Sequence, residues 1–239
     1  MFRASLRWLL PLGIALVVGA VWLTMGMHAA GPTKPAMVVP PASPGDRLAL
    51  ILTGEGQRPS PAVQDLVLGL AHGGIPTVAM PVTPDDITPA RAGARVDSVL
   101  RALMSRWHRG RIVLVGYHDG ASLAPFVANR IGADLLARVD LLVLAGLEPR
   151  ANFHAGAARW LERAPRPTDL PVIPELERLR GVPVLCVDPD RGRREGFCAT
   201  VGQGLVRTRV RLKRAEVAAQ GVAVARSVLA SLPSLATTP

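Results

Sequence analysis

Aromatic side chains and lysine are scarce in this chain of 239 residues. Phe, Trp and Tyr make up 4% of the sequence, so the core has to be built from many small aliphatic contacts. Lys34 and Lys213 are the only lysines among 28 basic residues, and the formal net charge is +10. An arginine excess of this kind is what a GC-rich genome produces without selection for a ligand. No aromatic residues are interleaved with the arginines and no nucleic-acid-binding motif is present, so we expect no nucleic-acid partner.

Cysteine is also rare. Cys186 and Cys198 are the only two, and they do not form a C-x-x-C motif, which argues against a redox-active site. In an oxidising compartment we expect them to form a disulfide, which would contribute about 2 to 3 kcal/mol to stability. Two separate buried thiols are the alternative.

The N-terminal residues 1–30 predict a membrane anchor. Arg3 and Arg7 precede the stretch 8–27, which carries no charge and is long enough to cross a bilayer. Basic residues ahead of the apolar stretch place the N-terminus in the cytoplasm, so the prediction is a single-pass inner-membrane protein with its domain in the periplasm. Secretion to the periplasm after signal cleavage is the alternative, although 28–30 is a poor cleavage site.

The rest of the chain predicts one α/β domain over residues 47–234. It follows a proline-rich linker (31–46) with polyproline character and precedes a short tail (235–239). Apolar strand-like runs cover 48–52, 75–80, 112–115, 139–144, 182–187 and 205–212, and helical periodicity covers 61–71, 90–107, 121–131 and 215–232. Apolar strands that alternate with helices predict a mainly parallel sheet covered on both faces, a three-layer sandwich. The stretch 146–177 is predicted to be an irregular insertion.

A tight turn follows the strand-like run 112–115. It reads Gly116-Tyr117-His118-Asp119-Gly120 and leads into a helix. A strand, a Gly-x-X-x-Gly turn and a helix are typical of the nucleophile elbow of α/β-hydrolases, which normally presents a serine. His118 stands in the place of that serine, so a serine acyl-enzyme at this position is excluded.

A Ser-acid-His triad in the order expected of an α/β-hydrolase cannot be assembled from this chain. Ser122 lies one helical turn beyond the elbow, where its hydroxyl would point along the helix, so we do not assign it as a nucleophile. The base of an α/β-hydrolase follows the last strand, but no histidine follows His154. His72, His108 and His154 show no metal-ligand spacing, and we expect no metal or cofactor.

The ordered series of motifs resembles the VirJ/AcvB family of bacterial virulence proteins. The segments that carry the resemblance are 52–56, 115–121, 125–126, 129–130, 144–147, 152–153, 160–161 and the two cysteines. The resemblance covers essentially the whole domain and implies a periplasmic protein of α/β-hydrolase fold. It also implies hydrolysis of aminoacylated phosphatidylglycerol and a link to virulence or envelope-stress tolerance. The family has serine where this chain has His118, and a Gly-His-His stretch near 212–215, where this chain reads Leu-Lys-Arg-Ala.

These departures predict a degenerate site that binds an aminoacyl-phospholipid, or a protein partner in the envelope, without turning it over. The alternative is an active hydrolase in which His118 pairs with Asp188 or Asp190 and acts as a general base on water, a route worth roughly 100- to 10,000-fold. Backbone N–H groups of Gly54, Glu55 and Gly56, and of the helix start at Asp119, are expected to bind an anion.

A basic stripe is predicted near the C-terminus. Arg207, Arg209, Arg211 and Lys213 alternate with apolar or small residues, so they share one face of a strand. Such a face could lie against anionic phospholipid headgroups, where each basic side chain contributes on the order of 1 kcal/mol.

Overall fold

The computed structural model describes residues 35–54, 58–82, 88–153, 169–189, 196–217 and 219–233. In this part of the chain, one seven-stranded sheet has the order β1-β3-β2-β4-β5-β8-β9. Its strands are β1 (Met37–Val39), β2 (Arg47–Thr53), β3 (Thr77–Pro81), β4 (Arg111–Tyr117), β5 (Val139–Ala145), β8 (Val184–Asp188) and β9 (Thr208–Arg211). β1 pairs antiparallel with β3, and the other neighbouring strands of this sheet pair in parallel. The predicted mainly parallel sheet is confirmed.

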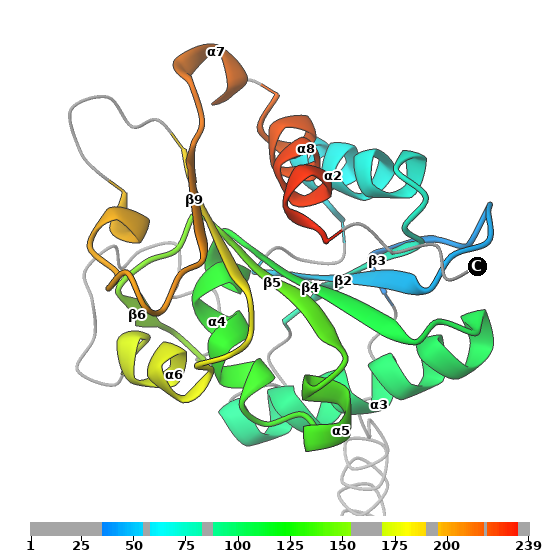
Figure 1. Ribbon diagram of the computed structural model, residues 1–239, viewed down its shortest axis with the longest axis horizontal. Helices are drawn as coiled ribbons and strands as arrows, with labels where there is room; N and C mark the ends of the chain where they lie inside the picture. The colour runs from blue at the N-terminus through cyan, green and yellow to red at the C-terminus, as the bar shows by residue number, and fades with distance from the viewer. Residues whose placement is uncertain are drawn as a thin grey trace, which may run out of the picture. The chain divides into compact units, whose positions relative to one another are not determined.

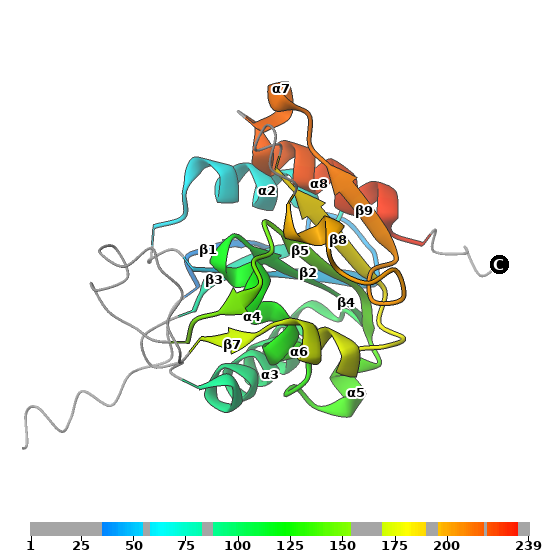
Figure 2. The ribbon, with the colours of Figure 1, turned by 90° about the vertical axis from the view of Figure 1, so that its left-hand side faces the viewer.

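Helices cover both faces of this sheet, as Figures 1 and 2 show. One face carries α2 (Pro61–His72) and α8 (Gln220–Ser231), and the other carries α3 (Pro89–Trp107), α4 (Asp119–Ala128), α5 (Ala133–Leu136) and α6 (Ile173–Arg178). Alternate residues of one strand enter different cores: Leu48, Leu50 and Leu52 pack toward α3 and α4, whereas Ala49 and Ile51 pack toward α2 and α8. Each fully buried leucine contributes about 1.5 to 3 kcal/mol, which explains why the stretch from Leu48 to Leu52 is apolar on both faces.

The helices α2 and α3, which lie on opposite faces of the sheet, begin in the same way. Ser60 and Thr88 are N-cap residues whose hydroxyls accept hydrogen bonds from the backbone N–H groups of Val63 (3.4 Å) and Arg91 (3.3 Å). A proline follows each cap at the first helical position, where its missing N–H costs nothing. These local signals explain why the sequence predicted both helices within one residue at their N-termini.

Glycines let α2 and α8 approach closely. A Cβ atom on Gly221 would lie 2.0 Å from the carbonyl oxygen of Ala62, and one on Gly69 would lie 2.7 Å from the Cβ of Ala225. The C-terminal helix is therefore fixed against α2 by direct contact between the two backbones.

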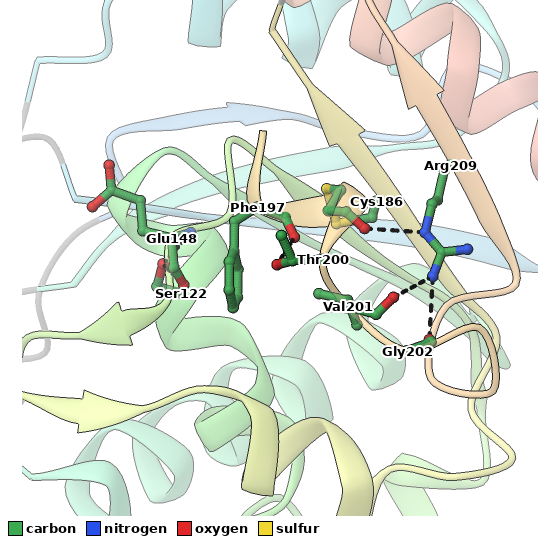
Figure 3. The surroundings of a disulfide bond; sticks show 9 residues. Ser122, Glu148, Cys186, Phe197, Thr200, Val201, Gly202 and Arg209 are labelled. Carbon is green, nitrogen blue, oxygen red and sulfur yellow. Dashed lines mark hydrogen bonds between the residues drawn. A yellow bond between two sulfur atoms is a disulfide. The ribbon is translucent and has the colours of Figure 1, made fainter. Parts of the chain in front are cut away.

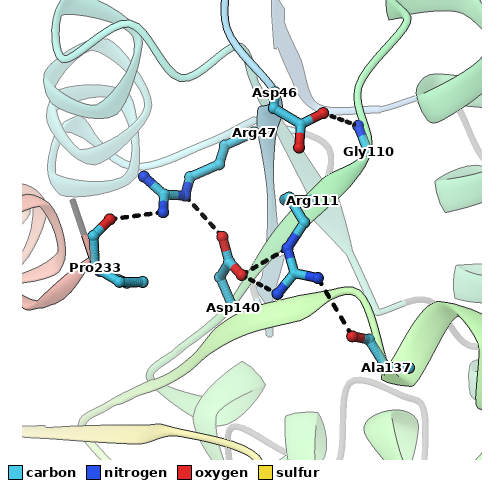
Figure 4. A network of polar contacts seen from close by, with 7 residues as sticks. All are labelled: Asp46, Arg47, Gly110, Arg111, Ala137, Asp140 and Pro233. Atoms are coloured by element: carbon cyan, nitrogen blue, oxygen red, sulfur yellow. Dashed lines mark hydrogen bonds and ion pairs between the residues drawn. The ribbon is translucent and has the colours of Figure 1, made fainter. Parts of the chain in front are cut away.

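The amino ends of the central strands are joined by a buried ion-pair network (Figure 4). Arg47 at the start of β2 donates from Nε to Asp140 on β5 (2.7 Å) and from a terminal nitrogen to the carbonyl of Pro233 (2.7 Å). Arg111 at the start of β4 donates from Nε to the same carboxylate (2.7 Å). Burial alone would raise the pKa of Asp140, but the hydrogen bonds from Arg111 and Arg47 outweigh it, so the pKa lies below its ordinary value. This network lies at the amino ends of the strands, whereas the elbow lies at their carboxyl ends.

The structure corrects four sequence predictions. Met37–Val39 lies within the stretch assigned to a polyproline spacer, yet it forms β1, because its β-branched residues can pair with the exposed edge of β3. The insertion 146–177 is not wholly irregular, since it contains α6 and the two-residue strands β6 (Arg150–Ala151) and β7 (Leu170–Pro171). The strand predicted over 205–212 is shorter because 203–205 forms a turn. The closing helix predicted over 215–232 is divided into α7 (Arg214–Val217) and α8.

The predicted anchor 8–27 lies outside the described residues. Among the helices that are described, none has the length and apolarity needed to cross a bilayer.

Candidate functional site

His118 stands at the apex of the turn between β4 and α4. Its backbone has φ 51° and ψ −118°, a region that residues other than glycine rarely adopt, and its side chain is exposed. The backbone is held on both sides: the His118 N–H donates to the carbonyl of Ala145 (2.8 Å), and the His118 carbonyl accepts from the N–H of Ala121 (2.8 Å). The predicted strand-turn-helix is confirmed, and an imidazole is the side chain that this turn presents.

The two glycines of the elbow are required by contact distance. A Cβ atom on Gly120 would lie 2.0 Å from the carbonyl oxygen of Leu52, and one on Gly116 would lie 2.4 Å from the carbonyl oxygen of Gly120. Both contacts are with backbone atoms, which cannot rotate away. The Gly-x-X-x-Gly spacing therefore reflects close packing of Gly120 against β2 and of Gly116 against the start of α4, whatever residue occupies the apex.

Loops that follow β2 and β5 border the elbow. A Cβ atom on Gly54 would lie 2.4 Å from the Cβ of Asp119, so the end of β2 touches the start of α4. Gly146 has φ 82°, and a Cβ atom there would lie 3.7 Å from Nδ1 of His118. The structure thus brings Gly54, Asp119 and His118 together, and adds Gly146, which the sequence analysis did not single out. Glu55 and Gly56 lie outside the described residues, so their part in anion binding stays a prediction.

Ser122 is a structural residue. Its side chain is buried, and its hydroxyl accepts a hydrogen bond from the backbone N–H of Glu148 (3.1 Å). The hydroxyl therefore fixes the segment that follows β5 onto α4.

Asp188 ends β8 at the same edge of the sheet as His118. In the register of the sheet, Tyr117 pairs with Ala145 and Ala145 pairs with Val187. His118 and Asp188 each come one residue after these aligned positions, so they lie at the same height along the strands. The strand β5 lies between them, which places their backbones about 10 Å apart. Asp188 is 7% exposed, and its carboxylate lies against Gly196: a Cβ atom there would be 2.0 to 2.2 Å from the carboxylate atoms. Asp190 lies outside the described residues.

The predicted disulfide is confirmed. Cys186 on β8 is bonded to Cys198 in the 3₁₀ helix η2 (Phe197–Ala199), and both cysteines are buried. The bond ties η2 to the strand that carries Asp188.

All four side chains of the predicted basic stripe, Arg207, Arg209, Arg211 and Lys213, are exposed, but only Arg209 and Arg211 lie within β9. Arg209 has a role that the sequence analysis missed, because it also donates hydrogen bonds to three backbone carbonyls of residues 198–202. Lys213 follows β9, where an α/β-hydrolase has its histidine, and its backbone N–H donates to the carboxylate of Glu216 (2.9 Å).

Glu175 is a buried acid on α6, away from His118 and Asp188 in the fold. It receives hydrogen bonds from the side chains of Asn129 (2.7 Å) and Arg130 (3.0 Å) at the end of α4. Burial alone would raise the pKa of Glu175, but the hydrogen bonds from Arg130 and Asn129 outweigh it, so the pKa is lowered. This network fastens α6 to α4 and has a structural role. Within the described ranges, no three His, Cys, Asp or Glu side chains are grouped closely enough to hold a metal ion.

Comparison with known proteins gives a family and a fold. The model of a family described as "Bacterial virulence protein (VirJ)" matches residues 46–226. Est1E from Butyrivibrio proteoclasticus is similar in structure, with a TM-score of 0.55 and 15% identity over 82% of this chain and 98% of that one. A dienelactone hydrolase from Anabaena variabilis has a TM-score of 0.53 and 14% identity over 82% of this chain and 91% of that one. An alpha-beta serine hydrolase homologue from Coxiella burnetii has a TM-score of 0.51 and 17% identity, covering 80% and 90% of the two chains. No curated protein matches the sequence. The α/β-hydrolase fold predicted from the elbow is confirmed.

Proposed function

Because the chain belongs to the VirJ family of bacterial virulence proteins and has the α/β-hydrolase fold, we propose that it is a membrane-anchored periplasmic member with a degenerate hydrolase site. Its ligand in this proposal is a phospholipid of the inner membrane, anionic or aminoacylated, which the site binds and does not hydrolyse. The predicted anchor over residues 8–27 would keep the domain close to that ligand.

His118 is the observation that carries the proposal. The elbow holds its apex residue in the strained conformation that normally presents a nucleophile, but the imidazole cannot form the ester intermediate of a serine hydrolase. The nearby hydroxyl of Ser122 is occupied by the backbone of Glu148. The segment after β9 offers Lys213 where a histidine would act as base. The fold is retained, and these three positions support the proposal that the groups that transfer an acyl chain are missing.

The exposed basic face of β9 supports a phospholipid ligand. Arg209 and Arg211 are exposed on β9, Arg207 and Lys213 are exposed just before and after it, and β9 is the last strand of the sheet. Basic side chains on one face attract an anionic bilayer surface by electrostatics, so the attraction has to weaken as salt screens it.

Turnover is tested with the full chain in mild detergent. The substrates are lysyl-phosphatidylglycerol vesicles and a short p-nitrophenyl ester, with release of lysine or p-nitrophenol as the readouts. We expect no release above buffer from the wild type or from His118→Ala. His118→Ser is also expected to be inactive, because a serine without a histidine base remains a weak nucleophile. Lysine release by the wild type that disappears in His118→Ala would contradict a degenerate site.

Binding is measured by cosedimentation with vesicles of phosphatidylcholine alone, or with added phosphatidylglycerol or lysyl-phosphatidylglycerol. We expect binding only to vesicles that contain phosphatidylglycerol or its lysyl ester, and weaker binding of His118→Ala to the lysyl ester. The matched control is His108→Asn, because His108 also has a positive φ but caps α3 at the opposite edge of the sheet. Equal binding to all three vesicles would rule out headgroup recognition and leave an envelope protein as the partner.

An active hydrolase is the second candidate, and the position of Asp188 favours it. Asp188 and His118 follow the same level of the sheet, so a general-base pair could form there. This candidate requires ester hydrolysis that is lost in both His118→Ala and Asp188→Asn but kept in His108→Asn. Hydrolysis that survives in Asp188→Asn would exclude the pair.

A further inference from the structure

The residues around Cys198 lie over Asp188. We call residues 196–202 the disulfide segment. At one end, Gly196 is in contact with the Asp188 carboxylate, since a Cβ atom there would lie 2.0 Å from its carboxyl carbon. Two residues further on, Cys198 is bonded to Cys186, which lies two residues before Asp188 on β8. The segment is therefore joined to β8 directly beside the acid.

Arg209 holds the same segment from the neighbouring strand. It is the register partner of Cys186 in the pairing of β8 with β9. Its Nε donates to the carbonyl of Cys198 (3.0 Å), and one terminal nitrogen donates to the carbonyls of Val201 (2.6 Å) and Gly202 (3.2 Å). Figure 3 shows these bonds beside the disulfide. Only a planar, forked cation can reach all three acceptors from one position.

We propose that the disulfide segment is a thiol-responsive cover of Asp188, closed by two separate ties, the Cys186–Cys198 bond and Arg209. Arg209 is a positioning residue in this arrangement, which holds whether the site binds its ligand or hydrolyses it. The disulfide is buried, with Cys186 0% and Cys198 2% exposed, so an attacking thiolate reaches it only after the segment opens. Arg209 therefore controls access to the bond, and the bond in turn keeps the segment on Asp188.

The reductant we invoke is a dithiol. One of its thiolates attacks a sulfur of the Cys186–Cys198 bond and forms a mixed disulfide, while the other cysteine leaves as a thiolate and takes up a proton. The second thiol of the reductant, as its thiolate, then displaces the remaining cysteine, which is also protonated. Two electrons and two protons pass to the protein, the reductant becomes a disulfide, and the segment keeps only the Arg209 tie.

Reduction kinetics separate this role of Arg209 from simple surface charge. Full chain in mild detergent is treated with excess dithiothreitol, and free thiols are trapped by alkylation and counted by mass. We expect Arg209→Gln to be reduced at least about tenfold faster than the wild type, which corresponds to about 1.4 kcal/mol. Arg209→Lys should also be reduced faster, because an ammonium keeps the charge but cannot span the three carbonyls.

The matched control is Arg207→Gln. Arg207 is exposed immediately before β9, two residues from Arg209, and among the described residues its side chain has no hydrogen-bond partner. Both Gln variants lose one positive charge, so both should bind anionic vesicles less tightly, whereas only Arg209→Gln should be reduced faster. Equal reduction rates for Arg209→Gln, Arg207→Gln and the wild type would overturn the role assigned to Arg209.

Hydrogen exchange tests the cover itself. The N–H groups of Ala199 and Thr200 donate within the segment, to Gly196 (3.1 Å) and Phe197 (3.0 Å), and report on whether it is closed. Native-state reduction of the wild type should speed their exchange at least tenfold, while the sheet amide of Arg207 keeps its rate. Unchanged protection of Ala199 and Thr200 after complete reduction would refute the switch.

A glycine pair tests the contact with Asp188 without touching either tie. Gly196→Ala introduces a methyl group that overlaps the Asp188 carboxylate, so it should raise exchange at Ala199 and Thr200 as reduction does. Gly204→Ala is the control, since a Cβ atom there meets no atom within 4 Å and Gly204 lies outside the disulfide segment. Identical exchange in the two variants would show that the segment does not rest on Asp188.

Discussion

The substitution Gly120→Ala tests the elbow geometry on which the site depends. The added Cβ would lie 2.0 Å from the carbonyl oxygen of Leu52, 2.6 Å from its carbonyl carbon and 3.1 Å from the N of Thr53. An ordinary contact needs at least 3.4 Å, so α4 and β2 would have to separate by more than 1 Å. β2 cannot yield easily, because it is hydrogen-bonded to β3 on one side and to β4 on the other.

Overpacking of a well-packed interior costs about 1 to 3 kcal/mol and sometimes more, and here only backbone atoms could move. We therefore expect Gly120→Ala to lower the free energy of unfolding by about 3 kcal/mol or more. With a urea m value near 2 kcal/mol/M, the unfolding midpoint, followed by circular dichroism, should fall by about 1.5 M.

The control for this measurement is Gly204→Ala. A Cβ atom on Gly204 has no neighbour within 4 Å, so the free energy of unfolding should stay within about 0.5 kcal/mol of the wild type, and the midpoint within about 0.25 M. Equal midpoints for the two variants would mean that the turn does not press on β2, and the elbow assignment would be lost with it.

Three further predictions concern stability. The pKa of Asp140 is lowered in the folded state, so the ion pairs of Asp140 stabilise the fold above its unfolded pKa of about 3.8, and this stability is lost as pH falls through the lower folded value. Between pH 7 and pH 2 the urea midpoint should therefore fall less steeply in Asp140→Asn than in the wild type. Parallel curves for the two proteins would contradict this. Replacing Cys186 and Cys198 by alanine should lower the free energy of unfolding by about 2 to 3 kcal/mol, because the bond closes a loop between residues 12 apart; an unchanged urea midpoint would argue against it. Gly221→Ala should lower the thermal midpoint by several degrees, because its methyl would overlap the carbonyl of Ala62, and a rise would show that the helices can separate freely.

Much of the fold could be predicted because its signals are local. The strands at 47–53, 111–117 and 139–145 are mainly apolar after the charged residues at their amino ends, which is what a parallel sheet covered on both faces requires. Turn glycines and capping residues marked where strands and helices meet. The apex of the elbow followed from the spacing of Gly116 and Gly120 alone.

The missed features depend on contacts between distant residues. Met37–Val39 has no periodicity that distinguishes a strand from a linker. It forms a strand because β3 has a free side with which it can pair. Gly146 and Gly196 carry no chemical group, so nothing in the sequence marks them as neighbours of His118 and Asp188. Arg209 was assigned to a lipid-facing stripe from its alternation, and its bonds to residues 198–202 appear only once β8 and β9 are paired.

The close packing of the elbow separates shape from chemistry. Gly116 and Gly120 are fixed by their contacts with backbone, whereas the residue between them at the apex projects its side chain outward and adds little to the interior. A change at position 118 can therefore alter reactivity while the architecture stays intact. One codon change at this apex is therefore enough for an enzyme lineage to lose its reaction, whereas regaining it here would also require a base that this chain lacks after His154.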